Sequence, residues 1–230
     1  MGELGDAYHG VRLRVTSLVT AAGDAGVTRA APATPGWTVH DLVAHLTGVT
    51  ADIVNGNLAG VASDAWTAAQ VDARRARDVD ELLAEWDTHA TTVEGMVDQF
   101  GRAGRQLVAD AATHEHDIRG ALGRPGARDS DAVCIGFDFV GTWLGDALDA
   151  AGSGALRVEH EDGTTSFGAH DPTVTLRTTR FEFLRATTGR RCPAQVAAYD
   201  WDGGTAPDGF VLALFTARPD PLDEPNPPEE

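Results

Sequence analysis

Apolar residues recur at helical spacing through most of the first 150 positions of the chain. Between residues 3 and 22 they follow one face of a helix, and this pattern ends near Gly23. The same spacing returns over residues 38–58, 78–101, 107–123 and 129–151. Residues 60–78 are small, polar and rich in arginine, so we expect a connector there or a partly ordered extension of a helix. The pattern predicts a domain of packed helices over residues 1–152.

Near residue 152 the pattern changes to short alternating runs. The runs ALRVEHEDG, TTSFGA and PTVTLRTT are separated by glycine and proline, and they predict the strands of a small sheet. Helices over residues 180–187 and 193–199 would cover one face of this sheet, and VLALFTA at residues 211–217 is a candidate edge strand. The predicted fold class is therefore α + α/β, with a small α/β domain over residues 153–218. Residues 219–230 are acidic and rich in proline, so we expect a disordered tail.

Two of the predicted helices carry recognisable end signals. Thr38 and Asp41 stand three residues apart at the start of the second helix, where they resemble a capping box with Asp in the usual place of Glu or Gln. At the end of the helix over residues 107–123, Gly123 is followed by Pro125, the order expected after a helix C-terminus. The first signal favours a capping role for Asp41.

The charge balance and the cysteines limit which binding partners and which cellular compartment we expect. The chain has 18 basic and 35 acidic residues and a formal net charge of −17, whereas a nucleic-acid surface needs clustered cations. No apolar run approaches the roughly 20 residues that span a bilayer, and the first residues lack the features of a signal peptide. Cys134 and Cys192 show no CxxC spacing, which argues against a disulfide framework or a thiolate zinc site. We expect a cytoplasmic protein that binds neither nucleic acid nor membrane.

The candidate chemistry lies in the helix predicted over residues 107–123. Asp110 and His114 stand four residues apart, which places them on one helix face, roughly 6 Å apart along the axis. A carboxylate and an imidazole at this spacing can bind one metal ion, but a divalent site needs a third ligand. His45 is the candidate, because it lies on or beside the apolar face of the second helix and points inward. The ordinary alternatives are an exposed carboxylate for Asp110 and hydrogen-bonded core residues for the histidines.

Three further polar residues lie near these helix faces. Asp117 follows His114 by three residues, so it is placed to accept a hydrogen bond from an imidazole ring or to anchor a nearby arginine. His116 lies about 200° round the helix from His114 and cannot share its ion. His89 points inward from the helix over residues 78–101, where a core or pocket histidine is the simpler interpretation than a ligand.

Several stretches together resemble the mycothiol-dependent maleylpyruvate isomerase family. They are WTVHDLVAHLTG at residues 37–48, D-x-x-x-H-x-x-D-I-R-x-A-L-G at 110–123, and RFEFLRATTGRR with AQVAAYDWDG between 180 and 203. The resemblance spans nearly the whole chain. It implies an up-down helical bundle, similar to the DinB and YfiT-like four-helix metal-binding proteins, followed by a small α/β domain.

The resemblance also implies the ligands of a metal site. The family holds a divalent ion, usually zinc, by a histidine on the second helix and by a carboxylate and a histidine four apart on a later helix. These positions map onto His45, Asp110 and His114. The sequence departs from the family at two points, because Asp110 replaces the usual Glu and His116 replaces the aromatic residue of H-x-W-D.

A fourth functional residue follows from the resemblance alone. The family's arginine in the C-terminal domain, thought to hold a carboxylate of the substrate or of the thiol, matches Arg190 best. We therefore assign Arg190 to catalysis and to binding of the thiol cosubstrate. Its neighbouring alternatives are Arg180, Arg185 and Arg191.

The function that the resemblance implies is metal-dependent chemistry of a low-molecular-weight thiol such as mycothiol. A thiol with a pKa near ~8.5 is mostly protonated at neutral pH, and metal coordination deprotonates it. The thiolate can add to an activated double bond and leave after rotation, or it can remain on another electrophile. The prediction is thus a maleylpyruvate isomerase-like enzyme or a thiol S-transferase, a monomer or homodimer acting on a small electrophile.

The two cysteines of the chain are poor candidates for a catalytic nucleophile. We do not expect a protein nucleophile, because Cys134 lies in an apolar run without the cations that lower a thiol pKa, and Cys192 has no base to pair with it.

The alternative function is a metal-binding or metal-free helical module that has lost catalysis and serves as a binding or regulatory partner. The departures at Asp110 and His116 favour that alternative.

Overall fold

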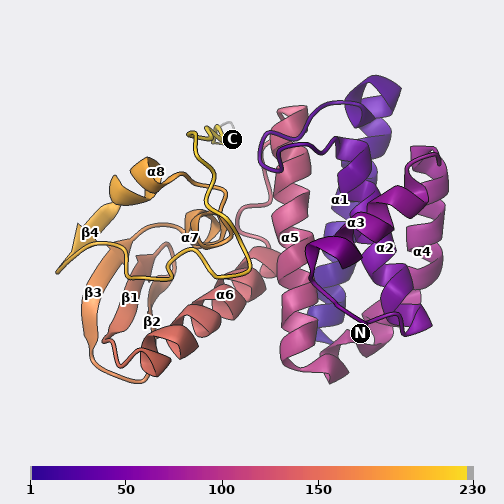
Figure 1. Cartoon of the computed structure of the whole chain (residues 1–230). Helices are drawn as coiled ribbons and strands as arrows, with labels where there is room; N and C mark the ends of the chain where they lie inside the picture. Colours follow the sequence, from indigo (N-terminus) through magenta and orange to yellow (C-terminus); the bar gives the residue numbers. More distant parts are fainter. Residues whose placement is uncertain (1, 227–230) are drawn as a thin grey trace. The chain divides into compact units, whose positions relative to one another are not determined.

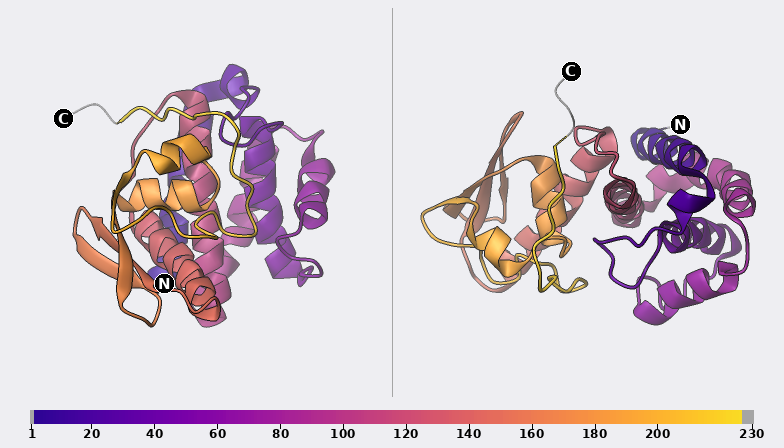
Figure 2. Two further views of the ribbon diagram at one scale, coloured as in Figure 1. Left: turned by 60° about the vertical axis from the view of Figure 1, so that its left-hand side comes forward. Right: turned by 90° about the horizontal axis from the view of Figure 1, so that it is seen from above.

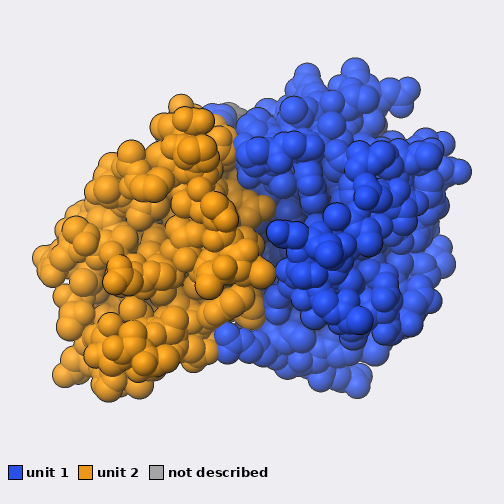
Figure 3. All heavy atoms as spheres, viewed as in Figure 1, with its two compact units in different colours: residues 1–126, 225–230 blue, residues 127–224 orange. Residues whose placement is uncertain are grey.

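The chain is organised into two compact units, each described here by itself. The computed structural model describes residues 2–226 (Figure 1). Unit 1 comprises Met1–Gly126 with Pro225–Glu230, and unit 2 comprises Ala127–Glu224 (Figure 3). Unit 1 is helical and unit 2 combines helices with a small mixed sheet, which confirms the predicted fold class. The predicted limits of independently folding domains, 1–152 and 153–218, stay a prediction.

Unit 1 is built from helices that pack along one another. They are α1 (Glu3–Val27), α2 (Val39–Asn55), α3 (Asp64–Arg74), α4 (Val79–Met96), the short 3-10 helix η1 (Val97–Phe100) and α5 (Arg102–Leu122). Helix α2 contacts α3, α4 and α5, and α1 contacts α4 and α5. The core contains the large buried side chains of Tyr8, Leu42 and Trp86. Burial raises the pKa of Tyr8 to about 12, so its phenol remains protonated and accepts a hydrogen bond from Trp86 Nε1.

Two helix ends agree with the predicted signals, whereas one predicted end and one predicted connector do not. Thr38 and Asp41 form the predicted capping box at the start of α2, and Gly123 ends α5 in the left-handed conformation. The predicted end of the first helix near Gly23 is wrong, because the chain bends there with a φ of 59° and the helix resumes to Val27. Residues 64–74 form the complete helix α3, where only a connector or a partial extension was expected.

Unit 2 places helices on one face of a mixed sheet (Figure 2). Its elements are α6 (Asp131–Ala150), β1 (Ala155–His160), β2 (Gly163–Phe167), β3 (Pro172–Arg177), α7 (Arg180–Thr187), α8 (Pro193–Ala197) and β4 (Asp200–Asp202). The strand order is β2-β1-β3-β4, and only the central β1/β3 pair is parallel. Phe137 on α6 contacts the rings of Phe167 on β2 and Phe183 on α7, with centroid distances of 5.2 and 5.1 Å. These aromatic contacts fix both helices against the sheet.

The predicted edge strand at residues 211–217 is wrong. This segment forms turns, in which Leu212 donates its backbone N–H to Thr187 and Phe215 donates to Leu212. The short strand β4 takes the edge position beside β3 instead. Leu212 of this apolar segment is buried without strand pairing, and Leu214 is exposed. No helix within residues 2–226 is both long and apolar enough to cross a membrane.

Candidate metal centre

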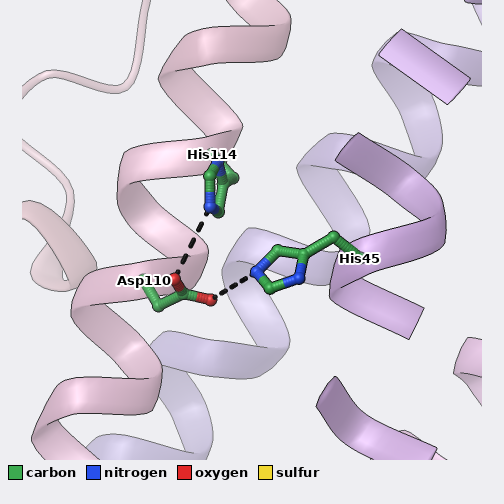
Figure 4. Close-up of side chains that lie close together, drawn as sticks. All are labelled: His45, Asp110 and His114. Carbon is green, nitrogen blue, oxygen red and sulfur yellow. Dashed lines mark ion pairs between the residues drawn. The ribbon is translucent and has the colours of Figure 1, made fainter. Parts of the chain in front are cut away.

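The three predicted ligands converge on one point in unit 1. His45 comes from α2, and Asp110 and His114 come from successive turns of α5 (Figure 4). The Nε2 atom of His45 lies 3.5 Å from Oδ2 of Asp110, and Nε2 of His114 lies 3.5 Å from Oδ1 of the same carboxylate. One ligand atom from each residue lies within 4.8 Å of the other two. The side chains that spacing and helix faces predicted to meet therefore do meet.

This arrangement fits a divalent metal ion. Zinc bonds to His nitrogen and carboxylate oxygen are about 2.0–2.2 Å long, so neighbouring ligand atoms in a tetrahedral site lie about 3.4 Å apart. Each imidazole Nε2 lies 3.5 Å from one oxygen of Asp110, Oδ2 for His45 and Oδ1 for His114, which is close to that value. Two imidazoles and one carboxylate are also the donor set of catalytic zinc sites, which keep a further coordination position open. The residues could hold zinc or a similar ion with a vacant position.

The cluster has a buried side and a more accessible side. The side chains of His45 and His114 are 5% and 10% exposed, whereas that of Asp110 is 35% exposed. The imidazoles are therefore enclosed by protein, and Oδ2 of Asp110, the oxygen that faces His45, is buried with them although the side chain is partly exposed.

A hydrogen bond behind each imidazole holds the ring in place. Behind His114, the Nδ1 atom lies 3.0 Å from Oδ2 of Asp117, and Thr34 donates its hydroxyl to that same oxygen at 2.9 Å. A carboxylate only accepts hydrogen bonds at neutral pH, so Nδ1 of His114 is the donor to Asp117, and Nε2 is the nitrogen that would bind an ion. Behind His45, the Nδ1 atom lies 2.9 Å from Oε1 of Gln70. The predicted bond from a ring to Asp117 is confirmed.

Trp37 forms an aromatic wall beside the two imidazoles. Its ring centroid lies 5.5 Å from that of His45 in an edge-on arrangement and 6.1 Å from that of His114, at an interplanar angle of only 19°. Trp37 is half-buried and stands at the end of the loop that also carries Thr34. The loop between α1 and α2 thus contacts the site through an aromatic ring and through a hydrogen bond to Asp117.

The other histidines singled out in the sequence lie outside the cluster. Among the described residues, the ligand group contains neither His89, which is half-buried, nor His116, which is buried. His40 also lies apart, since its Nε2 atom bonds the backbone carbonyl of Arg77 at 2.7 Å. The cysteines are both free thiols.

The surroundings of Cys134 differ from the expectation. The sequence predicts an apolar setting without cations, but Arg180 donates from Nη1 to its sulfur at 3.4 Å. That expectation is wrong, because the β1–β2 turn and α7 bring the arginine to α6. Burial nevertheless raises the pKa of Cys134, and the opposing effect of Arg180 does not reverse the shift. The thiol therefore stays protonated at neutral pH.

Arg190 lies in unit 2, in the loop after α7. It is buried, donates from Nη1 to the carbonyl of Thr188 at 2.8 Å, and places its guanidinium 5.9 Å from the Phe215 ring centroid. The alternative arginines form ion pairs, Arg180 with Asp162, Arg185 with Glu224, and Arg191 with Glu182 and Glu224. The functional role of Arg190 stays a prediction.

Sequence reasoning missed the residues that orient and enclose the cluster. Gln70 lies in the segment expected to be a connector, and no spacing rule relates it to His45, 25 residues away in the chain. Trp37 belongs to the motif that carries the family resemblance, but its position before a helix gave no sign of contact with the imidazoles. Thr34 lies in a Pro-rich link, whose conformation cannot be derived from periodicity.

Comparisons with known proteins agree with the geometry. Residues 9–124 match the family model described as the mycothiol maleylpyruvate isomerase N-terminal domain. No curated protein matches the chain. Two solved structures do, the mycothiol-dependent maleylpyruvate isomerase and a mutant of it, at 14% and 13% identity. Each match has a TM-score of 0.58 and covers 90% of this chain and 94% of the other. At this identity, the likeness to the solved structures shows the fold.

Proposed function

Because the chain belongs to the mycothiol maleylpyruvate isomerase family, a family of enzymes, we propose that it catalyses metal-dependent chemistry of a low-molecular-weight thiol. The thiol is mycothiol or a similar compound, and the second substrate is maleylpyruvate or a related small electrophile. The convergence of His45, Asp110 and His114 carries the proposal. Family membership favours an enzyme over the non-catalytic binding module that the sequence left open.

The residues of the site have separate tasks in this proposal. His45, Asp110 and His114 hold a divalent ion, for which zinc is our choice because of the donor set. A divalent ion bound there would lower the pKa of a coordinating thiol, so that the thiol reacts as a thiolate at neutral pH. Asp117 and Gln70 keep the Nε2 lone pairs of the two histidines directed at the ion. Trp37 shields one side of the imidazoles from water.

The proposed reaction needs no nucleophile from the chain. The thiol sulfur adds to one carbon of the activated double bond, which becomes a single bond and can rotate. Expulsion of the same thiol restores the double bond in the other configuration, so no atom is gained or lost. If the thiol is not expelled, the outcome is S-transfer. The protonated state of Cys134 agrees with a reaction in which the external thiol does this work.

Three further features belong to the proposal. The helical unit is proposed to share the DinB and YfiT-like four-helix architecture, since α1, α2, α4 and α5 are its long helices and the cluster joins two of them. The active form is proposed to be a monomer or homodimer. The cytoplasmic location expected from the sequence stays a prediction.

The assay that tests the function combines purified protein, zinc, mycothiol and maleylpyruvate. We expect conversion of maleylpyruvate only when protein, thiol and metal are all present, and loss of conversion after treatment with a chelator. A nitroaryl halide in place of maleylpyruvate tests S-transfer, which would form a coloured conjugate. Conversion at an unchanged rate by chelated protein, or without thiol, would contradict the proposal.

Arg190 is proposed to bind a carboxylate of the substrate or of the thiol. Replacing a charged hydrogen-bond donor costs about 1.5–3 kcal/mol, so we expect Arg190→Ala to raise the KM for one of the two by roughly 10- to 100-fold. Metal content should not change. Arg177→Ala is the matched control, because Arg177 is an exposed arginine of the same unit, paired with Glu159 on the sheet. An equal rise in KM for both variants would contradict the assignment.

A further inference from the structure

Gln70 ties helix α3 to His45. Gln70 and its neighbour Val71 are the buried residues of α3, and Gln70 is only 2% exposed. Its side chain enters over Gly48 of α2, where an added Cβ atom would lie 2.5 Å from Cβ of Gln70. The absence of a side chain at Gly48 therefore gives Gln70 the room to approach His45, one turn earlier on α2.

The direction of the Gln70 amide is fixed by Asp52. The Nε2 atom of Gln70 donates to Oδ2 of Asp52 at 2.8 Å, and Asn57 donates to Oδ1 of the same carboxylate at 2.9 Å. A carboxylate accepts hydrogen bonds but has none to donate at neutral pH. The NH₂ group of Gln70 must therefore face Asp52, and the carbonyl oxygen must face His45.

This direction decides which nitrogen of His45 carries the proton. Oε1 of Gln70 lies 2.9 Å from Nδ1 of His45 and can only accept, so Nδ1 is the donor and carries a proton. The other ring nitrogen, Nε2, faces Oδ2 of Asp110 and is the atom that would bind an ion. A reversed amide would present its NH₂ group to Nδ1 and move the proton to Nε2. An Nε2 atom that carries a proton cannot bind a metal ion.

We propose that Asp52, through Gln70, sets the tautomer of His45 and that Gln70 is a positioning residue of the metal centre. The two histidines are held differently, because Asp117 acts on His114 directly whereas the neutral amide of Gln70 needs Asp52 to define its direction. The consequence for metal binding rests on the proposed function. The tautomer itself is a property of the metal-free protein and can be measured without it.

Nitrogen chemical shifts of the imidazoles test the tautomer in metal-free protein by NMR. We expect Nδ1 of His45 to be protonated in the wild type. In Asp52→Asn the side chain at position 52 can either donate or accept, so Gln70 can reverse and a population with the proton on Nε2 should appear. Zinc affinity, measured by competition with a chromophoric chelator, should fall by up to about 10- to 100-fold.

A double substitution restores the arrangement in reversed form. In Asp52→Asn with Gln70→Glu, the new carboxylate at position 70 accepts from Nδ1 of His45, and the new amide at position 52 donates to it. We expect the Nδ1 proton and most of the zinc affinity to return. Gln70→Glu alone should bind zinc less tightly than the double variant, because it places two carboxylates against each other. This rescue separates a tautomer effect from general damage to α3.

Val71→Ala is the matched control, since it loosens α3 without touching Asp52, Gln70 or His45. It should leave the His45 tautomer unchanged. A wild-type His45 whose Nδ1 carries no proton, an Asp52→Asn variant with unchanged Nδ1 protonation and zinc affinity, or failure of the double variant to recover would overturn the proposal. Wild-type protein that keeps the Nδ1 proton but binds no zinc would instead count against the proposed function and leave the tautomer assignment standing.

Discussion

Replacing His45 by alanine is expected to deprive the protein of its metal ion and of thiol-dependent turnover. His45 is the ligand that α2 contributes, and without it the ion would be left with Asp110 and His114 from α5 alone. Loss of a hydrogen-bond partner behind a metal-binding histidine already lowers metal affinity about 10- to 100-fold, so loss of the ligand should lower it by more. Elemental analysis and chelator competition measure the metal, and the mycothiol assay measures turnover.

His40→Ala is the matched control for this experiment. His40 lies on the same helix, five residues earlier, and bonds the backbone carbonyl of Arg77 outside the cluster. Alanine favours helix at both positions, so neither change should break α2. We expect His40→Ala to retain wild-type metal content and turnover. Equal metal content in wild type and His45→Ala, or equal losses in both variants, would show that the cluster does not hold the ion.

Only the part of the candidate site that depends on the geometry of a single helix could be predicted from the sequence. The pairing of Asp110 with His114 needs nothing but the helix repeat, and their spacing survives any packing of α5. The inward direction of His45 follows from the apolar face of α2, but its meeting with the other two depends on how α2 packs on α5 and was supported by the family resemblance. Gln70 depends on the docking of α3 at Gly48, and no pattern in the sequence encodes that contact.

The fold shows the same division between local and long-range information. Helices with long apolar faces and strands with clear turn signals were predicted within a few residues, as for α7 at Arg180–Thr187. The apolar composition of residues 211–217 predicts a strand, but an apolar run that buries Leu212 can also form turns. The apolar periodicity predicts a helix end near Gly23 because it does not distinguish a bend from a stop.

The C-terminal segment presents the largest contrast between composition and structure. Its acidic, Pro-rich composition predicts disorder over residues 219–230, of which residues 227–230 lie outside the described part. Within residues 219–226, Leu222 is buried, and its backbone N–H and carbonyl pair with the side chain of Gln195 at 3.1 and 3.0 Å. Composition does not reveal such an attachment, because it depends on partners in α7, α8 and the loop between them.

Glu224 is the charged part of this attachment. Its carboxylate pairs with Arg185 at 2.6 Å and with Arg191 at 2.9 Å, and these arginine side chains are 0% and 4% exposed. Burial alone would raise the pKa of Glu224, but the two arginines outweigh it and hold the pKa below its usual value. Glu224 therefore stays ionised at neutral pH and offsets the charge of arginines that solvent does not reach.

Replacing Glu224 by glutamine is therefore expected to destabilise unit 2. Removing one partner of a buried ion pair leaves an uncompensated buried charge and costs about 3–5 kcal/mol. For a chain of this size, the corresponding fall in Tm is on the order of 10 °C. Thermal unfolding followed by circular dichroism at neutral pH measures it. Glu159→Gln is the matched control, because the pair of Glu159 with Arg177 is 40% and 44% exposed and should contribute less than about 1 kcal/mol.

The pH dependence of the stability difference between wild type and Glu224→Gln tests this prediction independently. A carboxylate whose pKa is lower in the folded state than in the unfolded state stabilises the fold above its unfolded pKa, near ~4.3 for Glu, and loses that effect as the pH falls through the folded value. The difference in stability between wild type and Glu224→Gln should therefore be full at neutral pH and shrink below about pH 4. If Glu224→Gln unfolds at the wild-type temperature at neutral pH, Glu224 does not anchor the C-terminal segment, and the disorder that its composition predicts would extend to residue 224.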